Sequence, residues 1–327
     1  MDIDAQRKTA SILRVLADAG RPLGSTRIAR ALILRGVDLK PRMIRYYLEE
    51  LDAQGFTANL GRPGRKITER GRRELGSAVA VDRVGFVSAR VDELAYVQSF
   101  NPERASGSVI LNVSTLPAAA AGRAKRLVRQ ALDAGLGMGR FVAVAGAGEE
   151  LAGVSVRKGE VALGTVCSVT LNGVLIAAGI PTVSRFGGLL EMRDGRPFRF
   201  TQIVNYDGTT VDPIEIFVKG RMTRVGDAAR TGTGTIGASF REIPAAALPR
   251  AEQVVEKLSL LGLGGVLTVG IPGHPVLDVP VSHGRVGLVV AAGLNPVAAV
   301  EEDGIPTDNR AMAALCEFES LRSCQCV

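Results

Sequence analysis

The chain has 327 residues, of which 46% are apolar and 22% are charged, and its formal net charge is +7. This composition excludes a disordered chain, and the length allows two or three domains with hydrophobic cores. No apolar run approaches the roughly 18 residues of a membrane-spanning helix. Acidic Asp2 and Asp4 do not fit a signal peptide. We therefore expect no membrane partner and a cytoplasmic location.

The positive charge is concentrated in the first quarter of the chain. Residues 1–76 carry 16 Lys and Arg against 9 Asp and Glu, whereas the other 251 residues carry 24 of each kind. Cationic side chains bind the phosphate backbone of DNA by releasing its condensed counterions, and a neutral segment does not contribute to that binding. The charge distribution therefore predicts a head that binds double-stranded DNA, followed by a neutral body.

Apolar residues at helical spacing predict three helices in the head. The first covers Ala5–Ala19, and the second follows the N-cap candidates Ser25 and Thr26. The third starts at Pro41, whose fixed φ suits the first helical position, and it ends at Gly55.

A basic hairpin follows the third helix. It is predicted by a strand at Phe56–Leu60, a turn of glycines and cations at 61–66, and a short strand at Ile67-Thr68. Thr68 is placed to cap a last short helix. Three helices with such a hairpin, called the wing, predict a winged helix-turn-helix over residues 1–78.

The third helix and the wing carry the candidate DNA contacts. In a winged helix-turn-helix the third helix lies in the major groove, and we expect Arg42, Arg45 and Tyr46 to read base edges while Lys40 holds a phosphate. A solvated basic face or a protein-assembly surface is the alternative, but the segregated charge favours DNA. The candidate DNA-binding residues are Lys40, Arg42, Met43, Arg45, Tyr46, Arg62, Arg65 and Lys66.

Beyond the head the sequence is duplicated. Leu116–Ala120 aligns with Ile243–Ala247, and Gly135–Gly137 aligns with Gly262–Gly264. We therefore expect an α/β or α+β body made of two regulatory repeats, 79–195 and 196–327, that pack about a pseudo-twofold axis. The expected strands and helices of the two copies are Val109–Val113 and Ile236–Phe240, Ala118–Ala134 and Ala245–Leu261, and Phe141–Ala145 and Val266–Val269.

The first copy contains two stretches dense in small polar residues and glycines, Gly164–Gly173 and Ser184–Gly188, the second of which includes Arg185. In the second copy the first of these stretches becomes Val290–Pro296. Backbone N–H groups and a bidentate guanidinium suit a small anionic metabolite such as a carboxylate, and clefts between related halves are common ligand sites. The alternative is that the glycines serve only turns and close packing. The candidate effector-binding residues are Thr165, Cys167, Ser168, Asn172, Arg185, Gly187 and Gly188.

The sequence offers little for catalysis. Its two histidines, His274 and His283, stand in loop or turn sequences without a nucleophile at motif spacing. Gly232–Gly237 satisfies G-x-G-x-x-G, but a strand sequence follows it where a dinucleotide-binding motif requires a helix. We expect no catalytic residues and no cofactor. A small-acid metabolic enzyme, or a ligand-binding module, fused to a winged helix is the alternative.

The four cysteines do not indicate a metal site or a disulfide framework. Cys167 is predicted to lie in an apolar strand, where a buried structural thiol is expected rather than a reactive one. Cys316, Cys324 and Cys326 lack the paired spacing of zinc ligands. We expect free thiols and no bound metal.

Several motifs resemble the NrpR family of nitrogen-responsive transcriptional repressors. They are Met43–Leu48 in the head and Gly164–Gly173, Ser184–Gly188, Tyr206–Thr209 with Asp212-Pro213, and Ser239–Pro244 in the body. The resemblance covers nearly the whole chain. It implies a homodimer that represses nitrogen-assimilation genes by binding a palindromic operator, with 2-oxoglutarate as the effector that releases it.

Overall fold

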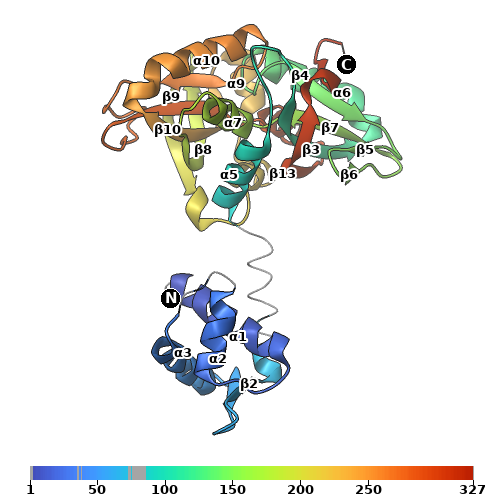
Figure 1. Cartoon of the computed structure of the whole chain (residues 1–327). Helices are drawn as coiled ribbons and strands as arrows, with labels where there is room; N and C mark the ends of the chain where they lie inside the picture. Colours follow the sequence, from blue (N-terminus) through green and yellow to red (C-terminus); the bar gives the residue numbers. More distant parts are fainter. Residues whose placement is uncertain (1–2, 35–36, 38, 73–74, 76–85, 327) are drawn as a thin grey trace. The chain divides into compact units, whose positions relative to one another are not determined.

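The computed structural model describes residues 3–34, 37, 39–72, 75 and 86–326 of the chain (Figure 1). The chain divides into two compact units, Met1–Gly85 and Phe86–Val327. The expected end of the head at residue 78 lies outside the described residues. Each unit has a hydrophobic core of its own, as independent domains require.

The amino-terminal unit is a winged helix-turn-helix. Its apolar helix faces meet in one core that includes Leu16, Ile28 and Leu48. Two short strands pair antiparallel, with Thr57 opposite Ile67, and form the wing. The elements are α1 (Ile3–Ala19), α2 (Ser25–Ile33), α3 (Pro41–Ala53), β1 (Thr57–Asn59) and β2 (Arg65–Ile67).

Two of the three helix starts that the sequence predicted in the head agree with the structure. Pro41 stands in the first turn of α3, as expected. Thr68 caps the short helix over 69–72, since its Oγ1 accepts a hydrogen bond from Gly71 N at 3.0 Å. The expectation for α2 was wrong, because Gly24 is its N-cap, and Ser25 already lies inside the helix.

The second unit, called the body, mixes helices with antiparallel strands. Its helices are α5 (Val87–Val97), α6 (Ala121–Asp133), α7 (Val169–Ala177), α8 (Pro213–Lys219), α9 (Val225–Thr231), α10 (Leu248–Leu260) and α11 (Asn295–Glu302). Its strands are β3 (Ser108–Pro117), β4 (Phe141–Ala145), β5 (Glu150–Leu151), β6 (Val154–Ser155), β7 (Glu160–Val166), β8 (Val183–Arg193), β9 (Arg196–Asn205), β10 (Gly234–Pro244), β11 (Val266–Val269), β12 (Arg285–Ala291), β13 (Asp308–Glu317) and β14 (Arg322–Ser323). Short 3-10 turns cover Ala118–Ala120, Tyr206–Gly208, Ala245–Ala247 and Phe318–Ser320.

The described part of the body contains two five-stranded sheets, in the orders β13-β3-β7-β4-β14 and β11-β12-β10-β8-β9, besides a β5-β6 hairpin. All neighbouring strands run antiparallel, which makes the body an α+β fold. Figure 1 shows β8, β9 and β10 on one side of the body and β3, β7 and β4 on the other, with α7 between them.

The two sequence copies share the same order of elements, but they exchange strands. Strand β8 belongs to the first copy and pairs with β10 of the second, while β13 of the second copy pairs with β3 of the first. The expected division between residues 195 and 196 falls in the turn between β8 and β9 and does not separate the sheets. Leu111 of β3 and Leu288 of β12 also belong to one buried cluster. The two halves therefore form one interlocked domain.

The expected helices and strands of the two copies are present, but some of them begin or end at other residues than predicted. Strands β4 and β11 have the predicted bounds, whereas β3 and β10 extend further in both directions, up to Pro117 and Pro244. Both predicted helices begin with a 3-10 turn of three alanines before α6 and α10. Strand β10 follows Gly232, as expected of a sequence that is not a dinucleotide-binding motif.

Candidate functional site

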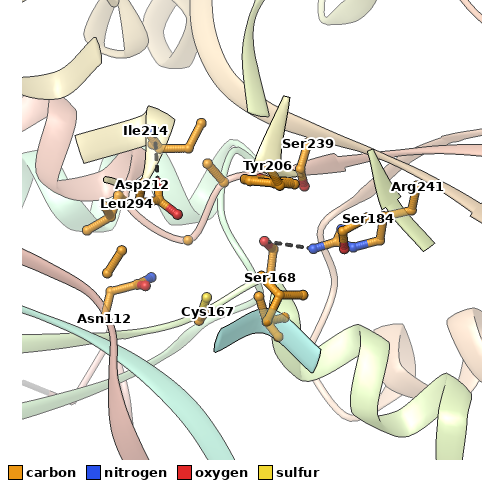
Figure 2. Close-up of a pocket in the computed structure, with 15 residues that line it drawn as sticks. Asn112, Cys167, Ser168, Ser184, Tyr206, Asp212, Ile214, Ser239, Arg241 and Leu294 are labelled. Carbon is orange, nitrogen blue, oxygen red and sulfur yellow. Dashed lines mark hydrogen bonds between the residues drawn. The ribbon is translucent and has the colours of Figure 1, made fainter. Parts of the chain in front are cut away.

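One cavity in the body, called the central pocket, is lined by polar side chains from both sheets (Figure 2). Strands β3, β8 and β10 contribute to its wall, together with the segments that lead into α7, α8 and α11. The lining residues are Val91, Asn112, Cys167, Ser168, Val169, Ser184, Tyr206, Asp212, Ile214, Ser239, Arg241, Ala292, Gly293, Leu294 and Ala311.

Arg241 is the cationic group of the central pocket. Only 1% of its surface is exposed. Its Nη2 donates a hydrogen bond to Ser168 Oγ at 3.0 Å, while Nε and Nη1 have no hydrogen-bond partner among the described residues. Burial lowers the pKa of Arg241. Among the described residues no carboxylate forms an ion pair with this guanidinium, and a buried charge without a counter-ion is strongly unfavourable.

A β-bulge in β8 sets Ser184, and not Arg185, beside Arg241. The register of β10 against β8 shifts between Phe240, which faces Phe186, and Arg241, which faces Ser184. The intervening residue of β8, Arg185, is exposed. Strand β10 keeps its regular alternation, since Ser239 and Arg241 both line the pocket. Because the extra residue of a bulge breaks the alternation only along its own strand, Arg241 faces the pocket while Arg185 turns outward.

Further hydrogen-bond donors surround the guanidinium. The hydroxyls of Ser168, Ser184 and Ser239 line the pocket, and Asn172 Nδ2 donates to Ser184 Oγ at 2.8 Å. Helices α7 and α11 both start at this cavity, after Ser168 and Gly293-Leu294. Helix N-termini present unpaired N–H groups and the positive end of the helix dipole. These groups together suit an anion.

Asp212 lies on the opposite side of the central pocket from Arg241 (Figure 2). Its Oδ1 accepts a hydrogen bond from Ile214 N at 2.8 Å and so caps α8. Burial raises the pKa of Asp212, although hydrogen bonds from the α8 backbone act in the other direction. The pocket therefore has a cationic end and an acidic end.

Cys167 and Tyr206 lie between these two ends. Burial raises the pKa of Cys167 to about 12 and also raises the pKa of Tyr206. For both groups the charge of Asp212 raises the pKa, and the charge of Arg241 lowers it. Cys167 is thus a buried neutral thiol and not a nucleophile, as expected. It does not lie within a strand, however, because β7 ends at Val166.

The central pocket has little free volume. The space open to the centre of a water molecule is about 20 Å³, which is room for about one water. Gly293 contributes to this tight fit, because a Cβ atom there would collide with Val166 O and the Cys167 backbone. A ligand the size of a dicarboxylate can enter only if part of the wall moves.

The structure brings together only some of the expected effector residues. Cys167 and Ser168 line the central pocket, Asn172 holds the lining residue Ser184, and Thr165 pairs with the lining residue Asn112. Arg185 is exposed and does not line the pocket, contrary to our expectation, because the bulge turns it away.

The expected glycines also lie elsewhere. Gly187 and Gly188 are buried in β8, where a Cβ would press against Tyr206 and Pro213 or against Gln202 and Phe200. They serve close packing.

Sequence reasoning missed Arg241 and Asp212. Both stand in motifs that carried the family resemblance, but neither was assigned a role. The duplication contained a usable signal, since the residue that corresponds to Arg241 in the first copy is Ser114.

The head presents a separate candidate surface on α3. Arg42, Met43, Arg45 and Tyr46 are all exposed on one side, with 44% and 62% exposure for Met43 and Tyr46, while Ile44 is fully buried. Lys40 is the exposed N-cap of α3. Because α3 turns cations and a tyrosine outward together, this face has the composition of a recognition helix.

The wing divides its cations between two roles. Arg62 and Lys66 are exposed. Arg65 is not available in the same way, since its Nε donates to Asp52 Oδ2 at 2.7 Å and its backbone pairs with Leu23. Only 17% of the Arg65 side chain is exposed. Arg65 therefore fastens the wing to α3, and in this it differs from the exposed candidate DNA-binding residues Arg62 and Lys66.

The described residues show no metal-ligand cluster and no disulfide. His274 and His283 are exposed in turns. None of the helices in the described part of the chain has the length and apolar character needed to cross a bilayer.

Comparisons with known proteins agree with the two-part architecture. Residues 84–323 match the family described as NrpR regulatory domains NRD1 and 2, and residues 10–75 match the Ribonuclease R winged-helix domain. The crystal structure of a nitrogen repressor-like protein from Methanococcus jannaschii superposes with a TM-score of 0.63 at 25% identity, over 73% of this chain and 99% of that chain.

Three curated relatives are nitrogen regulators. The chain is 33% identical to the global nitrogen regulator NrpRI of Methanosarcina mazei, over 98% of this chain and 99% of that protein. It is 29% and 28% identical to the global nitrogen regulators NrpR of Methanococcus maripaludis and Methanocaldococcus jannaschii, over 95% and 97% of this chain but 54% and 55% of those longer proteins. These relatives are regulators and not enzymes, which agrees with our expectation of a non-enzyme. By its regulatory body and by its similarity over nearly the whole chain, this protein belongs to the NrpR family of nitrogen regulators.

Proposed function

We propose that this protein is a nitrogen-responsive transcriptional repressor that binds a two-fold operator as a homodimer and releases it when 2-oxoglutarate enters the central pocket. The basic, exposed face of α3 and the cations Arg62 and Lys66 of the wing support DNA binding. The names of the relatives support nitrogen control. Its place of action is the cytoplasm, where the operator and the metabolite are both accessible.

The unpaired guanidinium of Arg241 is the observation that carries the effector assignment. Among the described residues, the buried donors Nε and Nη1 of Arg241 have no hydrogen-bond partner. The hydroxyl of Ser168 binds Nη2, but it is uncharged and does not neutralise the guanidinium. A carboxylate of the ligand would accept hydrogen bonds from these donors and neutralise the charge in a site shielded from water. Small acids with at least one carboxylate are therefore the ligand class that fits best.

The small free volume of the central pocket suggests how ligand binding and DNA binding are coupled. A ligand larger than one water must displace part of the wall, and Val91 of α5 belongs to that wall. In the described chain, α5 is the first helix after the head. Movement of α5 is therefore the step by which a ligand in the body would alter DNA binding by the head.

The proposal is tested by fluorescence anisotropy with the protein and its own upstream DNA, at two salt concentrations, with and without millimolar 2-oxoglutarate. We expect salt-sensitive specific binding that weakens when the metabolite is added. Arg241→Met should keep the DNA affinity and lose the response, whereas the matched control Arg185→Met should keep both. Specific binding that ignores 2-oxoglutarate would exclude this effector, and DNA binding without sequence preference would exclude the operator.

A further inference from the structure

The two ends of the central pocket differ in charge, and this difference constrains how an acidic ligand can bind. Arg241 and the hydroxyls of Ser184 and Ser239 form the cationic end. Asp212 lies at the other end, on the same side of the view as Leu294 and Asn112 (Figure 2). Cys167 and Tyr206 also line the pocket, and Figure 2 shows them between Asp212 and Arg241. A single ligand that fills the pocket contacts both ends.

A dicarboxylate that pairs with Arg241 would place its second acid group near Asp212. Two ionised carboxylates in contact repel each other strongly when both are shielded from water, so one of them must hold a proton. Proteins with paired carboxylates resolve this conflict by sharing one proton between the two groups. Asp212 can play this part, because it is partly buried in the wall of the central pocket and has no cationic hydrogen-bond partner among the described residues.

From this arrangement we propose that Asp212 determines ligand specificity by taking up one proton when a dicarboxylate binds, after which its hydroxyl donates a hydrogen bond to the second acid group of the ligand. The inference rests on the proposed function, and it adds the protonation state of the complex and the residue that holds the proton. The proton comes from solvent, and no covalent bond forms or breaks. Burial, which raises the pKa of Asp212, makes this uptake easier.

Other charged groups surround Asp212 and are alternative sites of titration. Arg90 on α5 lowers the pKa of both Asp212 and Glu215, and its Nη2 donates to Met312 O at 2.6 Å. Glu215 on α8 also has a raised pKa from burial, with contributions from Asp212 and from Asp308 on β13. Its Oε1 accepts a hydrogen bond from Ala311 N and does not line the central pocket. Glu215 is therefore the natural control residue.

The direction of the pH effect follows from linkage. Above the pKa of Asp212 in the free protein, this carboxyl is ionised and must gain a proton for the dicarboxylate to bind. The affinity for 2-oxoglutarate should therefore fall as pH rises, by up to about tenfold per pH unit, until the pKa of the complex is passed. Below the pKa of the free protein the affinity should stop changing, because Asp212 already carries the proton.

Isothermal titration of the full-length protein with 2-oxoglutarate, in two buffers of different ionisation enthalpy, measures the proton uptake directly. We expect close to one proton per ligand for the wild-type protein and for Glu215→Gln, and none for Asp212→Asn. The asparagine also accepts the cap hydrogen bond from Ile214, so α8 should remain folded. Asp212→Asn should bind 2-oxoglutarate independently of pH, and more tightly than wild type at alkaline pH.

The outcomes separate this inference from the function on which it rests. If the wild-type protein binds no 2-oxoglutarate at any pH, both the effector assignment and this inference are refuted. If wild type binds and Arg241→Met does not, but no proton is taken up, the effector stands and the inference is overturned. Tighter binding of glutamate than of 2-oxoglutarate, lost in Asp212→Asn, would show that Asp212 pairs with an ammonium group instead. Proton uptake that persists in Asp212→Asn and disappears in Glu215→Gln would move the proton to Glu215 and also overturn it.

Discussion

The two copies of the body have the same order of elements, yet only one of them supplies a charge to the shared cavity. Strands β3 and β10 have equivalent neighbours in the two sheets, since β3 lies between β13 and β7 and β10 lies between β8 and β12. Asn112 and Ser239, at matching positions, both line the central pocket. Two residues further along, the first copy has Ser114 and the second has Arg241. Both side chains are buried and carry atoms without hydrogen-bond partners among the described residues. The two copies thus share one scaffold and differ in charge at this pair of positions.

The largest effect should come from removing the charge that distinguishes the second copy. Arg241→Met should weaken 2-oxoglutarate binding by about 2 to 5 kcal/mol, or roughly 30- to 5,000-fold, because the ligand carboxylate would be left buried and unpaired. Without ligand, the variant should be no less stable than wild type, since an uncompensated buried charge is lost. Titration calorimetry and thermal unfolding measure the two effects. If Arg241→Met binds 2-oxoglutarate with the same affinity as wild type, the ligand does not bind at Arg241.

The second prediction concerns the two kinds of DNA contact in the head. Arg45→Ala should lose about 1 to 3 kcal/mol of binding to the specific operator and relax base preference, since this exposed side chain of α3 would read base edges. Lys66→Ala should lose less, and equally on specific and random DNA. Anisotropy on both DNAs at two salt concentrations makes the comparison. Equal losses on both DNAs for Arg45→Ala would refute its role in base reading.

A smaller effect is expected at the ion pair between the wing and α3. Arg65→Ala should destabilise the head by roughly 1 kcal/mol, because Arg65 and Asp52 form a partly buried, charge-assisted hydrogen bond. Asp52→Ala should cost about as much, and the double variant should cost less than the sum of both. Chemical denaturation of the three variants provides the cycle. Additive losses would show that the pair contributes no coupling, and Arg65 would then return to the candidate phosphate contacts.

The smallest effect should occur at the counterpart of Arg241 in the first copy. Ser114→Ala removes a buried hydroxyl that has no partner among the described residues. It should leave ligand affinity unchanged and change stability by no more than about 1 kcal/mol, in the stabilising direction. Calorimetry and thermal unfolding of this variant, beside Arg241→Met, test whether the copies differ in function. A loss of ligand binding in Ser114→Ala would contradict the one-site interpretation.

Much of the fold could be predicted from local sequence patterns. Helical periodicity and Pro41 indicated α3, the glycine-rich turn indicated the wing, and the repeated motifs indicated equivalent strands and helices in the two copies. These features depend on residues close together in the chain, where spacing and turn preferences act directly. The resemblance of longer motifs then pointed to the family that the comparisons show.

The candidate site could be predicted only in part. Ser168 and Cys167 were selected because they lie in a segment of small polar residues, and the structure places them in the central pocket. Arg185 was chosen for the same reason, yet it is exposed. Local composition identified a segment rich in ligand-binding residue types, but it did not show which side chains turn inward.

By itself the sequence determined a basic winged helix, a neutral duplicated body and membership of one regulator family. Only the tertiary structure decided that the copies exchange β8 and β13, and that Arg241 faces the cavity in place of Arg185. The physical reason is that both decisions depend on pairing between strands far apart in the chain. In the pairing of β8 with β10, one extra residue forms a bulge that sets Ser184 opposite Arg241 and turns Arg185 outward.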